Sequence, residues 1–302
     1  MMRPTRASLA GNAYLDLQNR ARKERRGTQE LLTLYVVERW LARLSGSAHA
    51  SKFVIKGGML LAAYDARWPT VDLDALARSI ADDQDTVVSL VSEIADIPLD
   101  DGVDFRTDTA TSRIIREQAL YSGVRIAMDT AISTAIVRFR IDVNFGDPIT
   151  PAPGWVTIPP LRAGMEPVRV LGYPVETVLA EKIATAIELG PANTRVRDYA
   201  DIYTLTGIHA IDHRTARQAL LATATHRAIS VQPLSAAVGS FAELRSQTYD
   251  AYRTGLGIPG LRLPADLESL VSGVAAFADP LAANTGEAEW QPDERRWSRL
   301  PN

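Results

Sequence analysis

One stretch of the sequence, residues 137–145, constrains the fold more than any other because its apolar and polar side chains alternate without a break. The apolar positions are Val137, Phe139, Ile141, Val143 and Phe145, and the polar ones are Arg138, Arg140, Asp142 and Asn144. Successive side chains of a β-strand point to opposite faces, so this strand has one core face and one polar face. Asp142 therefore shares the polar face of a sheet with two arginines.

A second alternating segment, Val71–Leu76, carries a pair of acids. Asp72 and Asp74 are two residues apart, so they point to one face of the predicted strand. Upstream, the β-branched and aromatic run 53–55 meets Gly57-Gly58 and then an apolar helix over 59–66, which predicts a strand, a glycine turn and a helix. Glycines at such a turn let backbone amides approach phosphate oxygens.

The three acids Asp72, Asp74 and Asp142 are the predicted metal ligands. Hard cations such as Mg²⁺ take oxygen ligands, and bridging acids hold two ions about 4 Å apart, where they stabilise both the attacking and the leaving oxygen of a phosphoryl transfer. An Asp-x-Asp pair or a Gly-Gly turn alone occurs in many proteins without such a role. The prediction rests on their conjunction, in the order found in nucleotidyltransferases related to polymerase β.

Composition narrows the available chemistry. The chain has no cysteine and only four scattered histidines, which excludes disulfides, thiolate nucleophiles and cysteine-type zinc or iron–sulfur sites and disfavours a histidine metal site. No run of about 20 apolar residues is present, and the basic N-terminal stretch has no apolar signal core. We therefore expect a cytoplasmic protein without a membrane partner.

Charge is unevenly distributed along the chain. Residues 1–50 hold nine Lys and Arg against four Asp and Glu, whereas residues 72–108 hold two basic against eleven acidic residues. The basic run 20–26 is a candidate for steering RNA by neutralising phosphates, and an ordinary solvated helix face is the alternative.

The periodicity predicts several helices, and proline marks a boundary. Helices are expected over 28–45, 83–94, 176–189, 196–205, 213–224 and 265–278. Six prolines between 148 and 172 disfavour helix and sheet. We therefore expect an N-terminal core over 1–147, a Pro-rich linker over 148–172 and a helical C-terminal domain over 173–302, with the active site in the cleft between the two domains.

Five segments resemble the successive signatures of one family. They are IKGGMLL at 55–61, RxxTxDLD at 67–74, IDVNFGD at 141–147, ETVLAEK at 176–182 and RDYADIY at 197–203. Together they look like the AbiEii/AbiGii nucleotidyltransferase toxin family, which includes the MenT-like toxins of type IV toxin–antitoxin systems. The resemblance runs from about Ala7 to the C-terminal tail and so covers nearly the whole chain.

The resemblance implies a fold and an activity. The fold is α/β (α+β): a polymerase β-like nucleotidyltransferase domain with a small mixed sheet, followed by a helical domain. The implied activity is Mg²⁺-dependent transfer of nucleotides from a nucleoside triphosphate (NTP) to RNA, at the 3′ acceptor end of tRNA, which blocks aminoacylation. A cognate AbiEi-like antitoxin is the implied protein partner.

Site residues carry over from the resemblance position by position. The implied catalytic residues are Asp72, Asp74, Lys182, Asp198 and Asp201, and the implied nucleotide-binding residues are Lys56, Gly57, Gly58, Arg67 and Thr70. Without the family, a structural helix salt bridge with Arg197 is the better interpretation of the acids at 198 and 201. Lys182 then fits a lysine snorkelling from a helix stripe as well as it fits a catalytic lysine. Arg67, Arg138 and Arg140 are candidates to pair with the strand acids or to contact phosphates.

Two rival functions remain at this level. One is a nucleotidyltransferase of the same fold that modifies a small molecule, such as an antibiotic. The other is a non-catalytic module that sequesters RNA or a protein. Intact acids argue against the second, and the basic arm argues mildly against the first.

Overall fold

A computed structural model describes residues 4–64, 66, 72–117, 121–283 and 287–299. By its contacts the chain divides into two compact units. The first comprises the described residues of 1–63, 67–146 and 154–172, and the second those of 64–66, 147–153 and 173–302. Within the described residues, no helix is long and apolar enough to cross a membrane.

The first unit combines a large sheet with a few helices. Its helices are α1 (Leu9–Glu24), α2 (Thr28–Ser45), α3 (Gly57–Leu60) and α4 (Gln84–Ala95), and a 3₁₀ turn spans Leu61–Tyr64. Its strands are β1 (Phe53–Lys56), β2 (Leu73–Ala77), β3 (Asp104–Glu117), β4 (Tyr121–Ile132), β5 (Ala135–Phe145), β6 (Gly154–Ile158) and β7 (Val168–Gly172). The predicted helix over 28–45 is confirmed at both ends, and Gly46 follows it.

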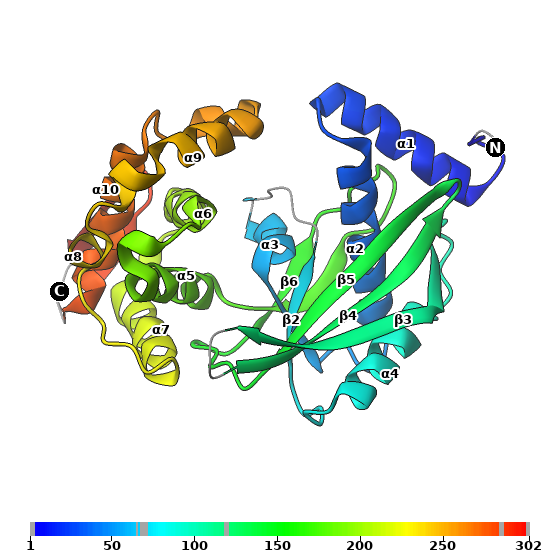
Figure 1. Ribbon diagram of the computed structural model, residues 1–302, viewed down its shortest axis with the longest axis horizontal. Coiled ribbons are helices and arrows are strands. Elements are labelled where there is room, and N and C mark those ends of the chain that lie inside the picture. The colour runs from blue at the N-terminus through cyan, green and yellow to red at the C-terminus, as the bar shows by residue number, and fades with distance from the viewer. Residues whose placement is uncertain (1–3, 65, 67–71, 118–120, 284–286, 300–302) are drawn as a thin grey trace. The chain divides into compact units, whose positions relative to one another are not determined.

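The seven strands form one mixed sheet in the order β3-β4-β5-β2-β1-β7-β6 (Figure 1). The β2–β5 and β1–β7 pairs are parallel, and the remaining pairs are antiparallel. The fold is thus mixed α/β with a mixed sheet, as predicted, but the sheet has seven strands and is larger than the small sheet expected. The sheet places the central strand β2 between β5, which carries Asp142, and β1, which carries Lys56.

Helices α2 and α4 cover the apolar face of the sheet. Trp40 of α2 is fully buried, stacks on Phe139 of β5 at 5.7 Å between ring centroids, and meets the ring of Phe53 edge-on at 5.9 Å. Its indole nitrogen donates a hydrogen bond to the carbonyl of Val91 in α4. The alternating apolar side chains of β5 therefore face the core, which leaves the polar face of the same strands on the opposite side.

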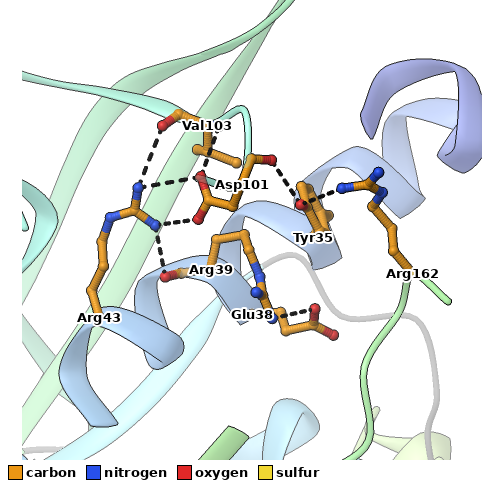
Figure 2. Close-up of polar contacts among 7 residues, drawn as sticks. All are labelled: Tyr35, Glu38, Arg39, Arg43, Asp101, Val103 and Arg162. Atoms are coloured by element: carbon orange, nitrogen blue, oxygen red, sulfur yellow. Dashed lines mark hydrogen bonds and ion pairs between the residues drawn. The ribbon is translucent and has the colours of Figure 1, made fainter. Parts of the chain in front are cut away.

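The charged side chains Glu38, Arg39 and Arg43 of α2 are buried, although helical periodicity favours charged residues on the solvent side of a helix. Figure 2 shows the polar contacts that make this burial possible. Glu38 pairs with Arg39 at 2.7 Å, and Arg43 pairs with Asp101 at 2.6 Å. Tyr35 donates to the carbonyl of Asp101 and accepts from Arg162. Buried charges require such partners, so this network fixes α2 to the loops around Asp101 and Arg162.

The second unit is largely helical. Its helices are α5 (Val175–Leu189), α6 (Val196–Thr206), α7 (His213–His226), α8 (Leu234–Val238), α9 (Phe241–Gly255) and α10 (Leu267–Ala278), with 3₁₀ turns at Gly190–Ala192, Ile258–Arg262 and Asp279–Ala282. A small sheet of β8 (Ile211–Asp212), β9 (Ala288–Gln291) and β10 (Arg296–Arg299) pairs in the order β10-β9-β8. Phe277, Trp290 and Trp297 pack together beside it.

The prediction that residues 148–172 form neither helix nor sheet is wrong. The stretch contains β6 and β7, which pair antiparallel from Gly154↔Gly172 to Ile158↔Val168. All six prolines lie outside these two strands. Because proline lacks the N–H that a ladder hydrogen bond needs, its positions bound the strands without preventing them.

The stretch between the expected helix over 83–94 and β4 is rich in Asp, a composition typical of a loop, but it contains a further strand. Residues Asp104–Glu117 form β3, the longest strand of the sheet, which pairs antiparallel with β4. Its sequence, DFRTDTATSRIIRE, is polar at most positions because β3 is an edge strand with one neighbour. Alternation between a core face and a polar face, the signal used for β5, is therefore weak in β3.

Candidate active site

Two of the three predicted metal-ligating acids lie side by side on neighbouring strands. β2 and β5 pair parallel with Asp74 directly opposite Asp142, and β1 pairs with β2 so that Lys56 is opposite Asp74. Residues directly opposite in a sheet share a face. Asp72 immediately precedes β2, two residues before Asp74, and its side chain is 29% exposed. The strand phase inferred from the sequence thus places all three acids on one face.

The glycine turn lies against one of these acids. Gly57 has φ +69°, and a Cβ added there would fall 2.1 Å from the Oδ2 of Asp74. No side chain fits such a position, because both the backbone angle and the carboxylate oppose it. Gly58 follows within α3, so the turn, the helix start and Asp74 form one compact structure, as the sequence suggested.

The third acid is held by an arginine that the sequence analysis did not single out. Arg125 of β4, opposite Asp142 in the sheet register, donates from Nε and Nη2 to the two carboxylate oxygens at 2.6 and 2.5 Å. These hydrogen bonds, with the charges of Asp142, Asp72 and Asp74, outweigh burial and raise the pKa of Arg125 above its already high ordinary value. All three acids therefore act on one guanidinium.

Two further arginines, both on β5, have different acidic partners. Arg140 lies 3.7 Å from Asp72, so it is a partner of the acid cluster, whereas Arg138 pairs with Asp129 at 2.7 Å. Arg67 and Thr70, the other candidates for nucleotide binding, lie outside the described residues.

The acids fit a divalent cation in part. Asp72 and Asp74 offer carboxylate oxygens, the donors that Mg²⁺ prefers. Both oxygens of Asp142 are engaged by Arg125, and among the described residues no three His, Asp or Glu side chains stand together as a group ready to hold a metal ion. Metal binding by the three acids stays a prediction, and it requires Arg125 to release or share Asp142.

A second cluster of charges lies between helices α5 and α6. Lys182 of α5 donates to Asp198 at 2.6 Å and to Asp201 at 2.8 Å, both on α6. Arg197 lies farther from Asp201, at 3.9 Å. Asp201 is almost fully buried, which raises its pKa although Lys182 and Arg197 act to lower it.

Lys182 in this cluster is neither a snorkelling lysine nor an isolated one. Burial acts to lower its pKa, but Asp201 and Asp198 outweigh burial and raise it. Its side chain is 17% exposed. The cluster thus joins α5 to α6 through one ammonium and two carboxylates, a stronger connection than the predicted Arg197–Asp201 helix pair. Whether these three residues also act in catalysis stays a prediction.

The basic run 20–26 lies at the end of α1 and is partly neutralised. Arg20 pairs with Glu24, and Arg26 pairs with Glu24 and Glu30. The remaining basic side chains are exposed and form no ion pair with any residue that the structure describes; they are Arg22, Lys23 and Arg25. Three charges, rather than the whole run, are available to an external polyanion.

The sequence analysis missed Arg125 and, one strand farther, Arg113 of β3. Their strand neighbours set them beside Asp142: Arg113 is opposite Arg125, and Arg125 is opposite Asp142. Arg125 belongs to β4, and its role depends on the pairing of that strand with β5. Strand pairing is a long-range property that periodicity within one segment does not contain.

This arrangement, a glycine turn between a strand and a helix facing acids on adjacent strands, suits nucleotidyl transfer, and comparison with known families identifies the class. The family model "Nucleotidyl transferase AbiEii toxin, Type IV TA system" matches residues 39–281. The chain therefore belongs to the AbiEii nucleotidyltransferase toxin family of type IV toxin–antitoxin systems. The resemblance inferred from the five motifs is confirmed.

Solved structures show a weaker likeness. JHP933 from Helicobacter pylori has a TM-score of 0.44 at 13% identity, over 85% of this chain and 93% of the other. A structure from H. pylori named "putative nucleotidyltransferase" has a TM-score of 0.43 at 14% identity, over 85% of this chain and 94% of the other. No curated protein matches.

Proposed function

We propose that this toxin transfers nucleotides from an NTP to RNA in the presence of Mg²⁺, at the 3′ acceptor end of tRNA, and thereby blocks aminoacylation and translation. Family membership supports the nucleotidyltransferase chemistry. The observation that carries the proposal further is the placement of Asp74 opposite Asp142 and against the turn at Gly57. A turn that could receive a nucleotide phosphate and carboxylates that could bind a cation lie at one place on the sheet, which supports the proposal.

In the proposed reaction, the residues of the first unit bind and orient the reactants. Asp72 and Asp74 would hold Mg²⁺, and Asp142 would be the third ligand, which requires Arg125 to release or share it. Mg²⁺, when bound, neutralises charge that develops on the phosphoryl oxygens. The backbone at Gly57 and Gly58 receives the triphosphate. Arg140 lies close to Asp72, and its side chain is 44% exposed. Because solvent reaches this side chain, it can change conformation and contact an incoming phosphate.

The proposed catalytic role of the helix cluster, Lys182, Asp198 and Asp201, rests on the family resemblance. Lys182 is proposed to offset negative charge on the leaving pyrophosphate, as a preorganised ammonium does. Its contacts with Asp198 and Asp201 support a role for the two acids in holding that ammonium in place. We further propose that a cognate AbiEi-like antitoxin is its protein partner and that the toxin acts in the cytoplasm.

The test is transfer of label from each of the four NTPs to purified total RNA, with Mg²⁺ and with EDTA. We expect one or more nucleotides to label tRNA, and chelation to stop the reaction. Label found only on small molecules, with RNA unlabelled under all conditions, would favour the small-molecule rival. Binding of RNA without any transfer would favour a sequestering module.

A further inference from the structure

Five charged side chains form one row across five strands of the sheet. In order they are Arg113 on β3, Arg125 on β4, Asp142 on β5, Asp74 on β2 and Lys56 on β1. Each is directly opposite the next in the strand register, so all five lie on the same face. Four of the five strands, β3, β4, β5 and β2, are labelled in Figure 1, and β1 follows β2 in the sheet order. Basic residues thus flank the two central acids on both sides.

One end of this row brings two like charges together, and only one of them has a compensating partner. Arg113 and Arg125 are directly opposite each other, and like charges at such positions destabilise a sheet. Asp142 neutralises Arg125 through both of its carboxylate oxygens. Arg113 is exposed and forms no ion pair with any residue that the structure describes.

A second row on the same face has charges of alternating sign, the arrangement that avoids repulsion between neighbouring strands. Arg106 of β3 is opposite Asp129 of β4, which is opposite Arg138 of β5. Charges alternate there, and Asp129 pairs with Arg138 at 2.7 Å. The same strands therefore accommodate alternating charge, and the pair Arg113–Arg125 departs from it beside the acids. An external anion at that pair would remove the repulsion.

We propose that Arg113, with Arg125 beside it, binds a backbone phosphate of the RNA acceptor. The inference rests on the proposed function, which places the triphosphate at the Lys56 and Gly57 end of the row. The arginine pair lies on the other side of the acids, where the second reactant must approach. An RNA strand carries a phosphate at every residue, whereas a neutral small acceptor has no group to match a second cation. Guanidinium groups recognise phosphate through paired N–H donors.

The variant that tests this is Arg113→Gln, because Arg113 is exposed and holds none of the acids. Its matched control is Arg106→Gln, on the same strand and the same face, with a side chain 45% exposed. Binding of a labelled RNA hairpin with a single-stranded 3′ end is measured by anisotropy between 50 and 200 mM salt, and the NTP KM is measured with that RNA. For Arg113→Gln we expect RNA Kd to rise about tenfold and the salt slope to fall by about 0.7 to 0.9. The NTP KM and the control should be unchanged.

A chemical probe gives the second readout. Single neutral methylphosphonate linkages are placed in turn near the 3′ end of the RNA. At one position the neutral linkage should weaken binding to the wild type but not weaken Arg113→Gln further, since the contact is already absent.

The inference is overturned if Arg113→Gln binds RNA as the wild type does, if Arg106→Gln loses as much, or if the NTP KM rises with the RNA Kd. It is also overturned if every neutral linkage weakens wild type and variant equally. Failure of the proposed function is distinguishable, because then the wild type itself transfers no label to RNA.

Discussion

Asp142 and Asp201 are both buried carboxylates paired with a basic side chain, yet their surroundings differ. Around Asp142 the neighbouring charges are within reach of solvent: Arg125 is 28% exposed and Asp72 29%. Around Asp201 they are enclosed: Lys182 is 17% exposed and Asp198 15%. Charges that solvent reaches can exchange one partner for another, whereas enclosed charges fix the elements that carry them. The sheet cluster of Asp72, Asp74 and Asp142 is thus suited to binding a ligand. The helix cluster of Lys182, Asp198 and Asp201 is suited to holding α5 against α6.

The largest expected effect concerns the acids of the sheet. Asp72→Asn and Asp74→Asn keep the side-chain shape but remove the charge that binds Mg²⁺. Each should lower the rate of label transfer by about 10³-fold or more, since several kcal/mol of stabilisation are lost. The melting temperature should change little. Asp129→Asn, an acid on the same face outside the cluster, is the control, and near wild-type transfer by both variants would remove the two acids from the site.

The next effect concerns stability of the helix cluster. Lys182→Met leaves Asp198 and Asp201 without their shared cation, and loss of one member of a buried ion pair costs about 3 kcal/mol. Urea unfolding measures the free energy. Lys23→Met, an exposed lysine on α1, should change it by less than about 0.5 kcal/mol.

Transfer by Lys182→Met at a temperature where it is folded gives a separate result. We expect roughly a hundredfold loss if the ammonium acts on the leaving pyrophosphate as proposed. Full-speed transfer with lowered stability would make the helix cluster purely structural and sharpen its contrast with the sheet.

Salt concentration should affect the interactions of exposed charges more than those of enclosed charges. Replacing Arg22, Lys23 and Arg25 with Ala removes three exposed charges. Between 50 and 200 mM salt, the rise in RNA Kd should therefore be about 40-fold smaller than for the wild type, given a slope of about 0.9 per phosphate. The stability difference between wild type and Lys182→Met should hardly change over that range. An unchanged salt slope would make the arm an ordinary solvated face.

The smallest effect is in the pH dependence. Because the pKa of Lys182 is raised in the folded state, its contribution to stability is fully present below the ordinary lysine pKa of about 10.4 and is lost as pH rises through the raised value. The difference in unfolding free energy between wild type and Lys182→Met should therefore stay constant from pH 7 to 9. A decrease within that range would contradict the raised pKa.

Sequence analysis found the acids of the sheet because alternation within a strand specifies a face. It placed Asp72 and Asp74 on one face of their strand and Asp142 on the polar face of another, and the pairing of β2 with β5 brings these faces together. It did not find Arg125, whose pairing depends on the β4–β5 hairpin. That hairpin turns at residues 133–134, where Ser133 has φ +55° and the strands pair from Ile132↔Ala135 onward. Ser-Thr is not an Asn-Gly sequence of the kind that marks a two-residue turn. The sequence therefore did not reveal the register of β4 against β5.

The contacts within the helix cluster could not be predicted from the sequence for a related reason. Lys182 and its two acids are 16 and 19 residues apart, on different helices. Helical spacing predicts neighbours within one helix, and it therefore predicted Arg197 as the partner of Asp201. Packing of α5 against α6 decides the actual partner, and local spacing does not encode it.

The most direct test of the account is Mn²⁺ binding, followed by electron paramagnetic resonance, in place of Mg²⁺ and with a non-hydrolysable NTP analogue. The proteins are the wild type, the double variant Asp72→Asn/Asp74→Asn, and Asp198→Asn from the helix cluster. We predict that wild type and Asp198→Asn bind Mn²⁺ alike and that the double variant loses this binding. Equal binding by all three proteins, or loss in Asp198→Asn alone, would contradict the assignment of metal and nucleotide to the sheet cluster.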